Sequence, residues 1–225
     1  MNRSNWLKQQ RREAEEKYDT LWSALYGEKY GLYGNATHQH FIQKFLSFLP
    51  KHSSILDAAC GAGRYTSMLI VNGNKVIGTD QSQGMLSRLK ARFPNIQVEK
   101  VGLQEMQYQE VFNGAICMDA MEHVCPEDWL VILNNFHQAL HPSGYLYFTV
   151  EIADENEVKG AFLRNQQLGL PVVYGEWPDE GDGVYHFYPS VQQVKQWIRQ
   201  ARFDLTEEGE GDGYYHFIAR KESEV

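Results

Sequence analysis

Two acids and a glycine-rich turn are the residues of this sequence best suited to bind a ligand. An apolar run ends at Asp57, and a turn with Gly61 and Gly63 follows before an expected helix. Glycines in such a turn let a ligand approach the backbone, and the N-terminus of the helix presents unpaired N–H groups there. Asp80 ends a second apolar run 23 residues after Asp57. An acid at the end of the second strand is typical of a group that holds a ribose diol.

The elements that must position these residues alternate between strands and helices. Apolar runs predict strands at 54–58, 75–80, 96–101, 114–118 and 145–150. Helical periodicity predicts helices at 64–72, after an N-cap at Ser82, at 129–140, and after a capping-box pattern at Ser190. Two last strands are predicted at 203–208 and 214–220, joined by a hairpin-length turn. This order indicates a mostly parallel sheet with helices on both faces and an antiparallel last strand.

The rest of the chain is expected to cover the site. Residues 4–26 have the periodicity of an amphipathic helix, and a loop rich in Gly and Tyr follows it. The tyrosines of that loop either bind a ligand or cover an edge of the sheet. Residues 151–188 are acidic, aromatic and rich in turns, and we expect an irregular lid there. We therefore divide the chain into a cap at 1–50 and a main domain at 51–225, with 151–188 as its lid.

Composition narrows the class of protein. The chain has 225 residues and a formal net charge of −8, which disfavours binding to nucleic acid because such proteins carry a basic face. No apolar run is long enough to cross a bilayer and no signal-peptide core is present, so we expect a cytoplasmic protein that does not bind membranes. Cys60, Cys117 and Cys125 fit neither a zinc template nor a disulfide framework. Cys60 and Cys117 are expected at strand ends facing the site, as small space-filling side chains.

Four stretches together resemble the motifs of a known family. They are the acid with its glycine turn, the second strand with its acid, a fourth strand followed by Glu-His-Val, and a turn before the fifth strand. These stretches lie at 56–63, 76–82, 115–124 and 140–146. In this order they resemble class I S-adenosylmethionine-dependent methyltransferases that modify small molecules, although Ser143 replaces a usual glycine. The resemblance implies a three-layer α/β/α sandwich around a Rossmann-like, seven-stranded, mostly parallel sheet with an antiparallel last strand.

The resemblance also implies a binding site for S-adenosylmethionine, which leaves as S-adenosylhomocysteine. Asp80 is expected to accept hydrogen bonds from both ribose hydroxyls, which suits the two oxygens of a carboxylate. Gln81 and Met85 are expected against the adenine ring. The sequence departs from the family at Gly102, where an acid is usual. The full set of residues expected at the cofactor is Tyr33, Asp57, Ala58, Ala59, Cys60, Gly61, Gly63, Tyr65, Asp80, Gln81, Met85, Gly102, Leu103, Gln104, Met118, Asp119 and His123.

Two of these assignments stay open, and one rival cofactor is disfavoured. Asp57 either contacts the amino group of the ligand through water or only caps N–H groups of the turn. His123 either closes over the ligand or caps its own helix. A nicotinamide dinucleotide requires a third small residue after the turn, where Thr66 stands, and Asp57 would repel its pyrophosphate. Both points favour a cationic sulfonium ligand.

Methyl transfer from a sulfonium is an in-line substitution that depends mainly on alignment and on exclusion of water. A general base is needed only when the acceptor must lose a proton. The ionisable candidates near the transfer point are Glu122, Glu151 and His186, although His186 is also consistent with packing in an aromatic hairpin. No metal is expected. The alternatives to a small-molecule methyltransferase are a non-catalytic S-adenosylmethionine-binding module that serves a partner protein and a protein methyltransferase. The NPPY-type signature of adenine and glutamine methyltransferases is absent after the fourth strand.

Overall fold

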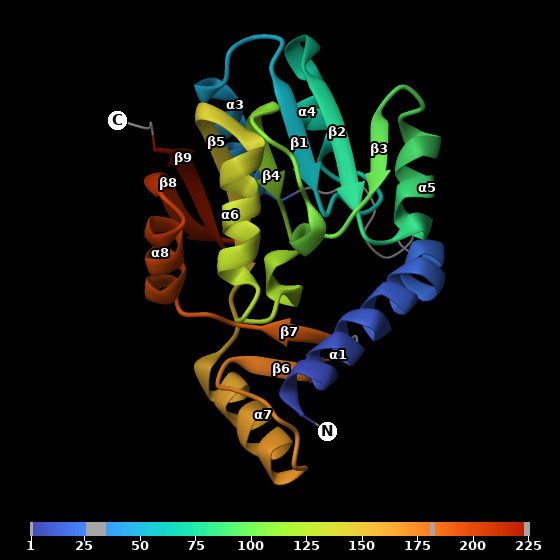
Figure 1. The fold of residues 1–225 in the computed structure, drawn as a ribbon, viewed down its shortest axis with the longest axis vertical. Coiled ribbons are helices and arrows are strands. Elements are labelled where there is room, and N and C mark those ends of the chain that lie inside the picture. Colours follow the sequence, from blue (N-terminus) through green and yellow to red (C-terminus); the bar gives the residue numbers. More distant parts are fainter. Residues whose placement is uncertain (1, 26–34, 181–182, 223–225) are drawn as a thin grey trace.

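A seven-stranded sheet forms the centre of the computed structural model, which describes residues 2–25, 35–180 and 183–222. The strand order is β3-β2-β1-β4-β5-β9-β8, as Figure 1 shows. The bounds of these strands are β1 Ser54–Ala58, β2 Lys75–Asp80, β3 Gln97–Lys100, β4 Phe112–Cys117, β5 Leu140–Glu151, β8 Phe203–Gly211 and β9 Tyr214–Lys221. Neighbours from β3 to β5 pair in parallel, and β9 pairs antiparallel with both β5 and β8. The predicted mostly parallel sheet with an antiparallel last strand is therefore confirmed.

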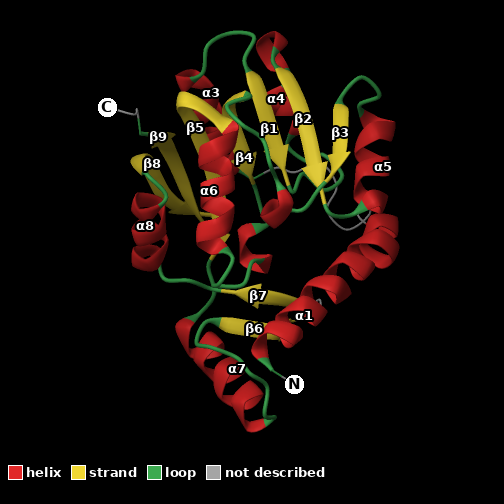
Figure 2. Ribbon diagram, viewed as in Figure 1, coloured by secondary structure: helices red, strands yellow, loops and turns green. Residues whose placement is uncertain are grey.

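Helices cover both faces of this sheet, which makes the predicted three-layer sandwich (Figure 2). The helices of the sandwich are α3 Ala36–Phe48, α4 Thr66–Leu69, α5 Gln83–Arg92, α6 Trp129–Ala139 and α8 Val191–Gln200. Successive strand residues face opposite layers, because side chains alternate across a strand. Leu56 and Phe148 pack in the cluster that contains α6 and α8, whereas Ile55 and Tyr147 pack in the cluster that contains α3. Burial on both faces explains why these strands are continuous apolar runs.

Two sequence-level boundaries differ from the structure. The helix predicted at 64–72 is only α4, followed by a 3₁₀ turn at Val71–Gly73, because Asn72 has a positive φ of 58° inside it. The strand predicted at 145–150 begins earlier, since β5 starts at Leu140 and shifts register opposite Phe112 and Gly114 of β4. Further short 3₁₀ turns follow two strands, η3 at Leu103–Glu105 and η4 at Met121–His123.

The N-terminal helix lies outside the sandwich. α1 (Arg3–Lys17) is capped by the side chain of Asn2, which accepts from the N–H of Asn5. It continues as one π-helical segment, η1 (Tyr18–Trp22), and then as a regular helix up to residue 25. π-helical turns are uncommon and are frequent at functional sites. The Tyr-rich loop predicted at 26–33 lies outside the described residues.

The described part of residues 151–188 contains regular elements, so the prediction of an irregular segment was wrong. They contain helix α7 (Glu155–Gln167) and an antiparallel hairpin of β6 (Glu176–Glu180) and β7 (Val184–Phe187). Asp154 caps α7 by accepting from the N–H groups of Asn156 and Glu157. Figure 1 shows α7 and the hairpin below the sheet, next to the start of α1. Among the described residues, none of the helices is both long and apolar enough to cross a bilayer.

Candidate functional site

A cavity of about 790 Å³ lies at the carboxyl ends of the parallel strands. Its wall includes Asp57 of β1, Asp80 of β2, Met118 after β4 and Glu151 of β5. Ligand sites of open α/β sheets occur at this edge, and small-molecule pockets span roughly 300–1,000 Å³. The cavity is therefore the candidate binding site, and its volume leaves room for a nucleoside together with a second small molecule.

α1 closes this cavity from the side away from the sheet. Arg3 binds both carboxylate oxygens of Glu176 in β6, at 2.8 and 2.9 Å, and Trp6 packs edge-on against Tyr185 of β7 with ring centroids 6.0 Å apart. At the other end, Asp19 accepts from the hydroxyl of Ser82 at 2.7 Å and caps the first turn of α5. Figure 1 shows α1 running from the hairpin to α5. Leu7, Arg11, Ala14 and Tyr18 of this segment line the cavity, and the sequence had not identified them.

The glycine turn after β1 divides into a ligand-facing part and a packing part. Ala59 and Gly61 have positive φ angles of 50° and 52° and line the cavity. Gly63 was expected at the ligand, but it does not line the cavity. A Cβ on Gly63 would lie 2.2 Å from a side-chain carbon of Leu89, so this glycine allows α5 to pack against the turn. Ala58 is also buried in the core rather than in the cavity wall.

Asp80 holds the turns on either side of the expected ribose position. Its two carboxylate oxygens accept hydrogen bonds from the backbone N–H groups of Gly61 and Ser82, each at 2.8 Å. Burial raises the pKa of Asp80 to about 6, although both of these backbone hydrogen bonds oppose that rise. Each oxygen keeps a second lone pair, so the carboxylate can still accept from a ligand diol.

Asp57 has a structural partner that the sequence had not indicated. It accepts from the hydroxyl of Thr66 at 2.8 Å, and it is 2% exposed. Burial raises the pKa of Asp57 to about 7, the Thr66 hydrogen bond opposes this, and the nearby Asp80 adds to it. Thr66 thus has a role in the turn, where a dinucleotide site would need a small residue. Burial also raises the pKa of the Cys60 thiol, so this cysteine is a neutral wall residue. Cys117 was expected to face the site, but it packs in the core.

The expected adenine region is assembled from β2, α5 and η3. Gln81, Met85, Gly102, Leu103 and Gln104 all line the cavity. At Gly102 the space beside the backbone is taken by the ends of two long side chains, since a Cβ there would lie 2.5 Å from both a guanidinium nitrogen of Arg11 and a carboxylate oxygen of Glu105. These two side chains bind each other above Gly102. An ion pair that involves α1 thus replaces an acid at this position.

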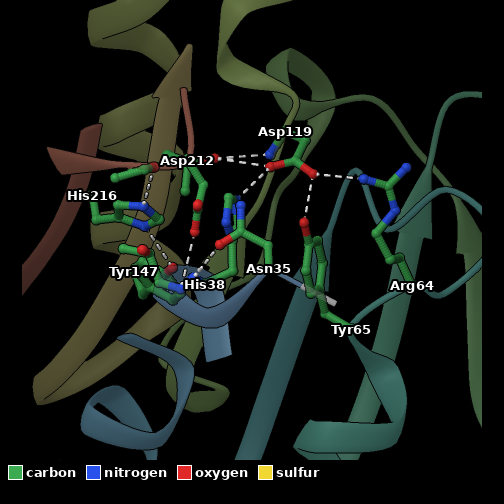
Figure 3. A network of polar contacts seen from close by, with 11 residues as sticks. Asn35, His38, Arg64, Tyr65, Asp119, Tyr147, Asp212 and His216 are labelled. Carbon is green, nitrogen blue, oxygen red and sulfur yellow. Dashed lines mark hydrogen bonds and ion pairs between the residues drawn. The ribbon is translucent and has the colours of Figure 1, made fainter. Parts of the chain in front are cut away.

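Asp119 is the centre of a polar network beside the glycine turn (Figure 3). It has a positive φ of 50° and accepts from His38 at 3.0 Å, from Arg64 at 2.9 Å and from the hydroxyl of Tyr65 at 2.5 Å. Burial alone would raise the pKa of Asp119, but the hydrogen bond from His38, the charges of His38 and Arg64 and the Tyr65 bond lower it overall. The backbone N–H of Asp119 donates to the hydroxyl oxygen of Thr149 in β5 at 2.9 Å. Asp119 is therefore an ionised anchor for the turn.

The other end of the cavity holds the three residues expected near the transfer point. Glu122, Glu151 and His186 all line it. His186 Nδ1 lies 2.9 Å from the carbonyl oxygen of Val184, which can only accept, so Nδ1 carries the proton. The other ring nitrogen lies 3.8 Å from a carboxylate oxygen of Glu151. This geometry supports an acid–base pair of Glu151 in β5 and His186 in β7. It also supports the predicted packing role, since His186 stacks on Tyr188 with ring centroids 6.0 Å apart.

His123 joins the α1 segment to the hairpin. Its Nδ1 donates to the carbonyl oxygen of Tyr185 at 3.0 Å, and its other nitrogen lies 3.0 Å from the hydroxyl of Tyr18 in the π-helical segment. Its ring centroid is 4.6 Å from that of His186. His123 lines the cavity, so it holds the wall in place rather than only capping its own short helix.

Most residues expected from the sequence at the site therefore meet in one cavity. Of the expected set, Ala58 and Gly63 do not line it, and Tyr33 lies outside the described residues. Arg64 and Tyr214 line it without having been expected. Among the described residues, no group of three or more His, Cys, Asp or Glu side chains has the arrangement of a metal site.

A family model described as a methyltransferase domain matches residues 55–144, which span the glycine turn, Asp80 and the segment after β4. Over these residues the chain is similar to a methyltransferase domain. Curated relatives include demethylmenaquinone methyltransferases of Chlorobaculum parvum and Chlorobaculum tepidum, at 28% and 29% identity over 150 and 154 residues. Each alignment covers 65% of this chain and 61% of the relative, so the chain matches about three fifths of the relatives' length.

Solved methyltransferases share the fold along most of the chain. A magnesium protoporphyrin IX methyltransferase from Synechocystis has a TM-score of 0.67 at 15% identity, over 94% of this chain and 99% of that chain. A 1,6-didemethyltoxoflavin-N1-methyltransferase from Burkholderia thailandensis has a TM-score of 0.64 at 17% identity, over 98% and 87%. Both were crystallised with S-adenosylhomocysteine. At these identities the likeness concerns the fold.

Proposed function

We propose that this protein is an S-adenosylmethionine-dependent methyltransferase that methylates a small-molecule acceptor. The observation that carries the proposal is the single cavity that joins the Gly61 turn and Asp80 at one end to Glu122, Glu151 and His186 at the other. The first end has the groups that a nucleoside with a charged tail requires. The second end has ionisable groups that can contact a methyl acceptor.

The donor set of the cavity fits a cationic sulfonium ligand. Carboxyl groups of Asp57, Asp80, Asp119 and Glu122 line it, and Arg64 faces them while bound to Asp119. Asp80 would accept from the ribose hydroxyls, and the backbone around Gly61 would contact the amino-acid part. When bound, S-adenosylmethionine would supply an electrophilic methyl group for in-line substitution.

The rest of the proposed mechanism depends on enclosure. α1 and the β6–β7 hairpin cover the cavity, and Arg3 and Trp6 hold the two together. Such enclosure excludes water and orders the acceptor against the methyl group, which is the main requirement of this reaction. His186 could take a proton from an acceptor that must lose one, with Glu151 3.8 Å away to stabilise the charged ring. The enclosed shape supports a small acceptor, as do the relatives named for quinone, toxoflavin and porphyrin substrates.

A methyl-transfer assay separates this proposal from its two alternatives. The protein is incubated with methyl-labelled S-adenosylmethionine and a deproteinised, low-molecular-weight cell extract, and in parallel with the protein fraction of that extract. Label in small molecules is the expected result. Label only in the protein fraction supports a protein methyltransferase. Binding of the labelled donor without transfer in either fraction supports a non-catalytic module and overturns the enzyme proposal.

A further inference from the structure

Among the described residues of the cavity wall, Glu122 stands out as a buried carboxyl group with an oxygen that lacks a hydrogen-bond partner. It is 3% exposed, it lines the cavity, and its Oε2 has no hydrogen-bond partner among the described residues. A buried carboxylate oxygen without a partner carries a large desolvation penalty when it is charged. Three other carboxyls of the cavity wall, Asp57, Asp80 and Asp119, each accept a hydrogen bond from another residue. The hydrogen bond that favours the ionised form of Glu122 comes from its own backbone N–H. Either a proton on Glu122 or a cation from outside the chain would offset this penalty.

The groups around Glu122 are mainly acidic. Asp119 and Glu151 face it from the ends of β4 and β5, and both disfavour its ionised form. Arg64 is the nearby cation, but it is bound to Asp119 at 2.9 Å and acts on Glu122 less strongly than burial and the two acids do. From η4 and β7, His123 and His186 also line this part of the cavity. Burial first, and then the two acids, raise the pKa of Glu122 well above its usual range.

We propose that Glu122 is the counter-charge for the positive donor: its carboxyl group is protonated in the free protein and ionises when a cationic ligand enters the cavity. The proton leaves to solvent, and the carboxylate then faces the positive charge of the ligand. This inference rests on the proposed function, because it takes the donor to be a sulfonium. It makes Glu122 a specificity residue that favours the charged donor over the uncharged thioether product.

Proton linkage gives a direct test with two known probes, S-adenosylmethionine and S-adenosylhomocysteine. Each is titrated into the folded protein by calorimetry in two buffers of different ionisation enthalpy, which gives the number of protons released. Because the probes share adenosine and the amino-acid tail, contributions of Asp80 and the ribose cancel in the difference. The expected result is that S-adenosylmethionine releases about one proton more per site than S-adenosylhomocysteine near neutral pH.

Substitutions identify the group that loses the proton. Glu122→Gln keeps the shape and should abolish the difference in proton release between the two probes. Glu151→Gln removes a neighbouring carboxyl of the same cavity and should leave a clear difference, so it is the matched control. The wild-type protein offers a second measurement that requires no variant. The affinity ratio of S-adenosylmethionine to S-adenosylhomocysteine should rise with pH, by up to about tenfold per pH unit, until Glu122 ionises in the free protein.

Each outcome decides a different claim. If both probes bind wild-type protein with equal proton release and a pH-independent affinity ratio, the inference is wrong while the proposed function stands. If Glu122→Gln is folded and still shows the difference, another group ionises and the assignment to Glu122 is wrong. If the folded protein, freed of carried-over ligand, binds neither probe, the proposed function fails and this inference fails with it.

Discussion

Replacing Asp119 by Asn should destabilise the protein strongly, because this carboxylate is the acceptor for three donors that are largely shielded from water. It binds Arg64 and His38, whose side chains are 11% and 0% exposed, and also the hydroxyl of Tyr65. Asn keeps one acceptor oxygen and loses the charge. Removing one partner of a buried ion pair costs about 3–5 kcal/mol, and the remaining oxygen offsets part of this. We expect a loss of about 3 kcal/mol in the free energy of unfolding, or about 6–12 °C in Tm.

Urea denaturation of four proteins tests this reasoning: wild type, Asp119→Asn, Arg64→Gln and the double variant. The double variant should cost clearly less than the sum of the single ones, because the two groups interact directly. The pKa of Asp119 is lowered by folding, so its contribution is present above the unfolded value of 3.8 and is lost as pH falls below that value. The acid limb of the stability curve should therefore be weaker in Asp119→Asn. A loss below about 1 kcal/mol, typical of an exposed pair, or strict additivity would refute the reasoning.

Three further predictions concern the turn, the cap and pH. Gly63→Ala should lower the free energy of unfolding, measured by urea denaturation, by about 2–5 kcal/mol. Gly213 has a similar φ of 83° but no atom near its Cβ position, so Gly213→Ala should lower it by only about 1–2 kcal/mol. Equal losses would contradict the steric argument. Arg3→Met removes the cation bound to buried Glu176 and should speed hydrogen exchange in the β6–β7 hairpin but not in the central sheet; unchanged hairpin exchange would contradict the anchoring role. Asp57 has a raised pKa of about 7, so its stabilising effect is present at low pH and lost as pH rises from 3.8 through about 7. Asp57→Asn should flatten that part of the urea-midpoint curve, and an unchanged curve would contradict the assignment.

The sheet could be predicted from the sequence because its signal is local. Strands such as β1 and β4 are buried on both faces, so they are short apolar runs bounded by turns, and the helices between them keep a helical period. The acids at the ends of β1 and β2 reach the same edge by topology alone. For this reason Asp57, Asp80 and the residues after β4 could be placed together before the structure was known.

The contacts that hold the cap in place could not be predicted, because they join distant parts of the chain. Arg3 pairs with Glu176, 173 residues away, and Arg11 pairs with Glu105 above Gly102. No local pattern shows that a charged helix face will bind a hairpin rather than water. Beyond the aromatic hairpin considered for His186, the regular elements of residues 151–188 were not predicted, because Pro178 and several glycines give this segment the composition of a loop.

The role of a single glycine is also difficult to predict from the sequence. Gly63 was interpreted as a point of ligand approach, yet the absent Cβ makes room for Leu89. A sequence shows that a side chain is missing but not what occupies the space. The sequence also could not show that an oxygen of Glu122 lacks a hydrogen-bond partner, because this depends on where all of the surrounding residues lie in the structure.

Binding of S-adenosylmethionine to the wild type and to Asp80→Ala tests the central claim most directly. Isothermal titration should show binding by the wild type. Loss of two hydrogen bonds to a charged group, each worth about 1.5 kcal/mol, should weaken it about 100-fold in the variant. Asp212→Asn, which changes an exposed carboxylate of the β8–β9 turn, is the control and should bind like the wild type. A folded, ligand-free wild-type protein that does not bind, or an Asp80→Ala variant that binds within about threefold of it, would contradict the account.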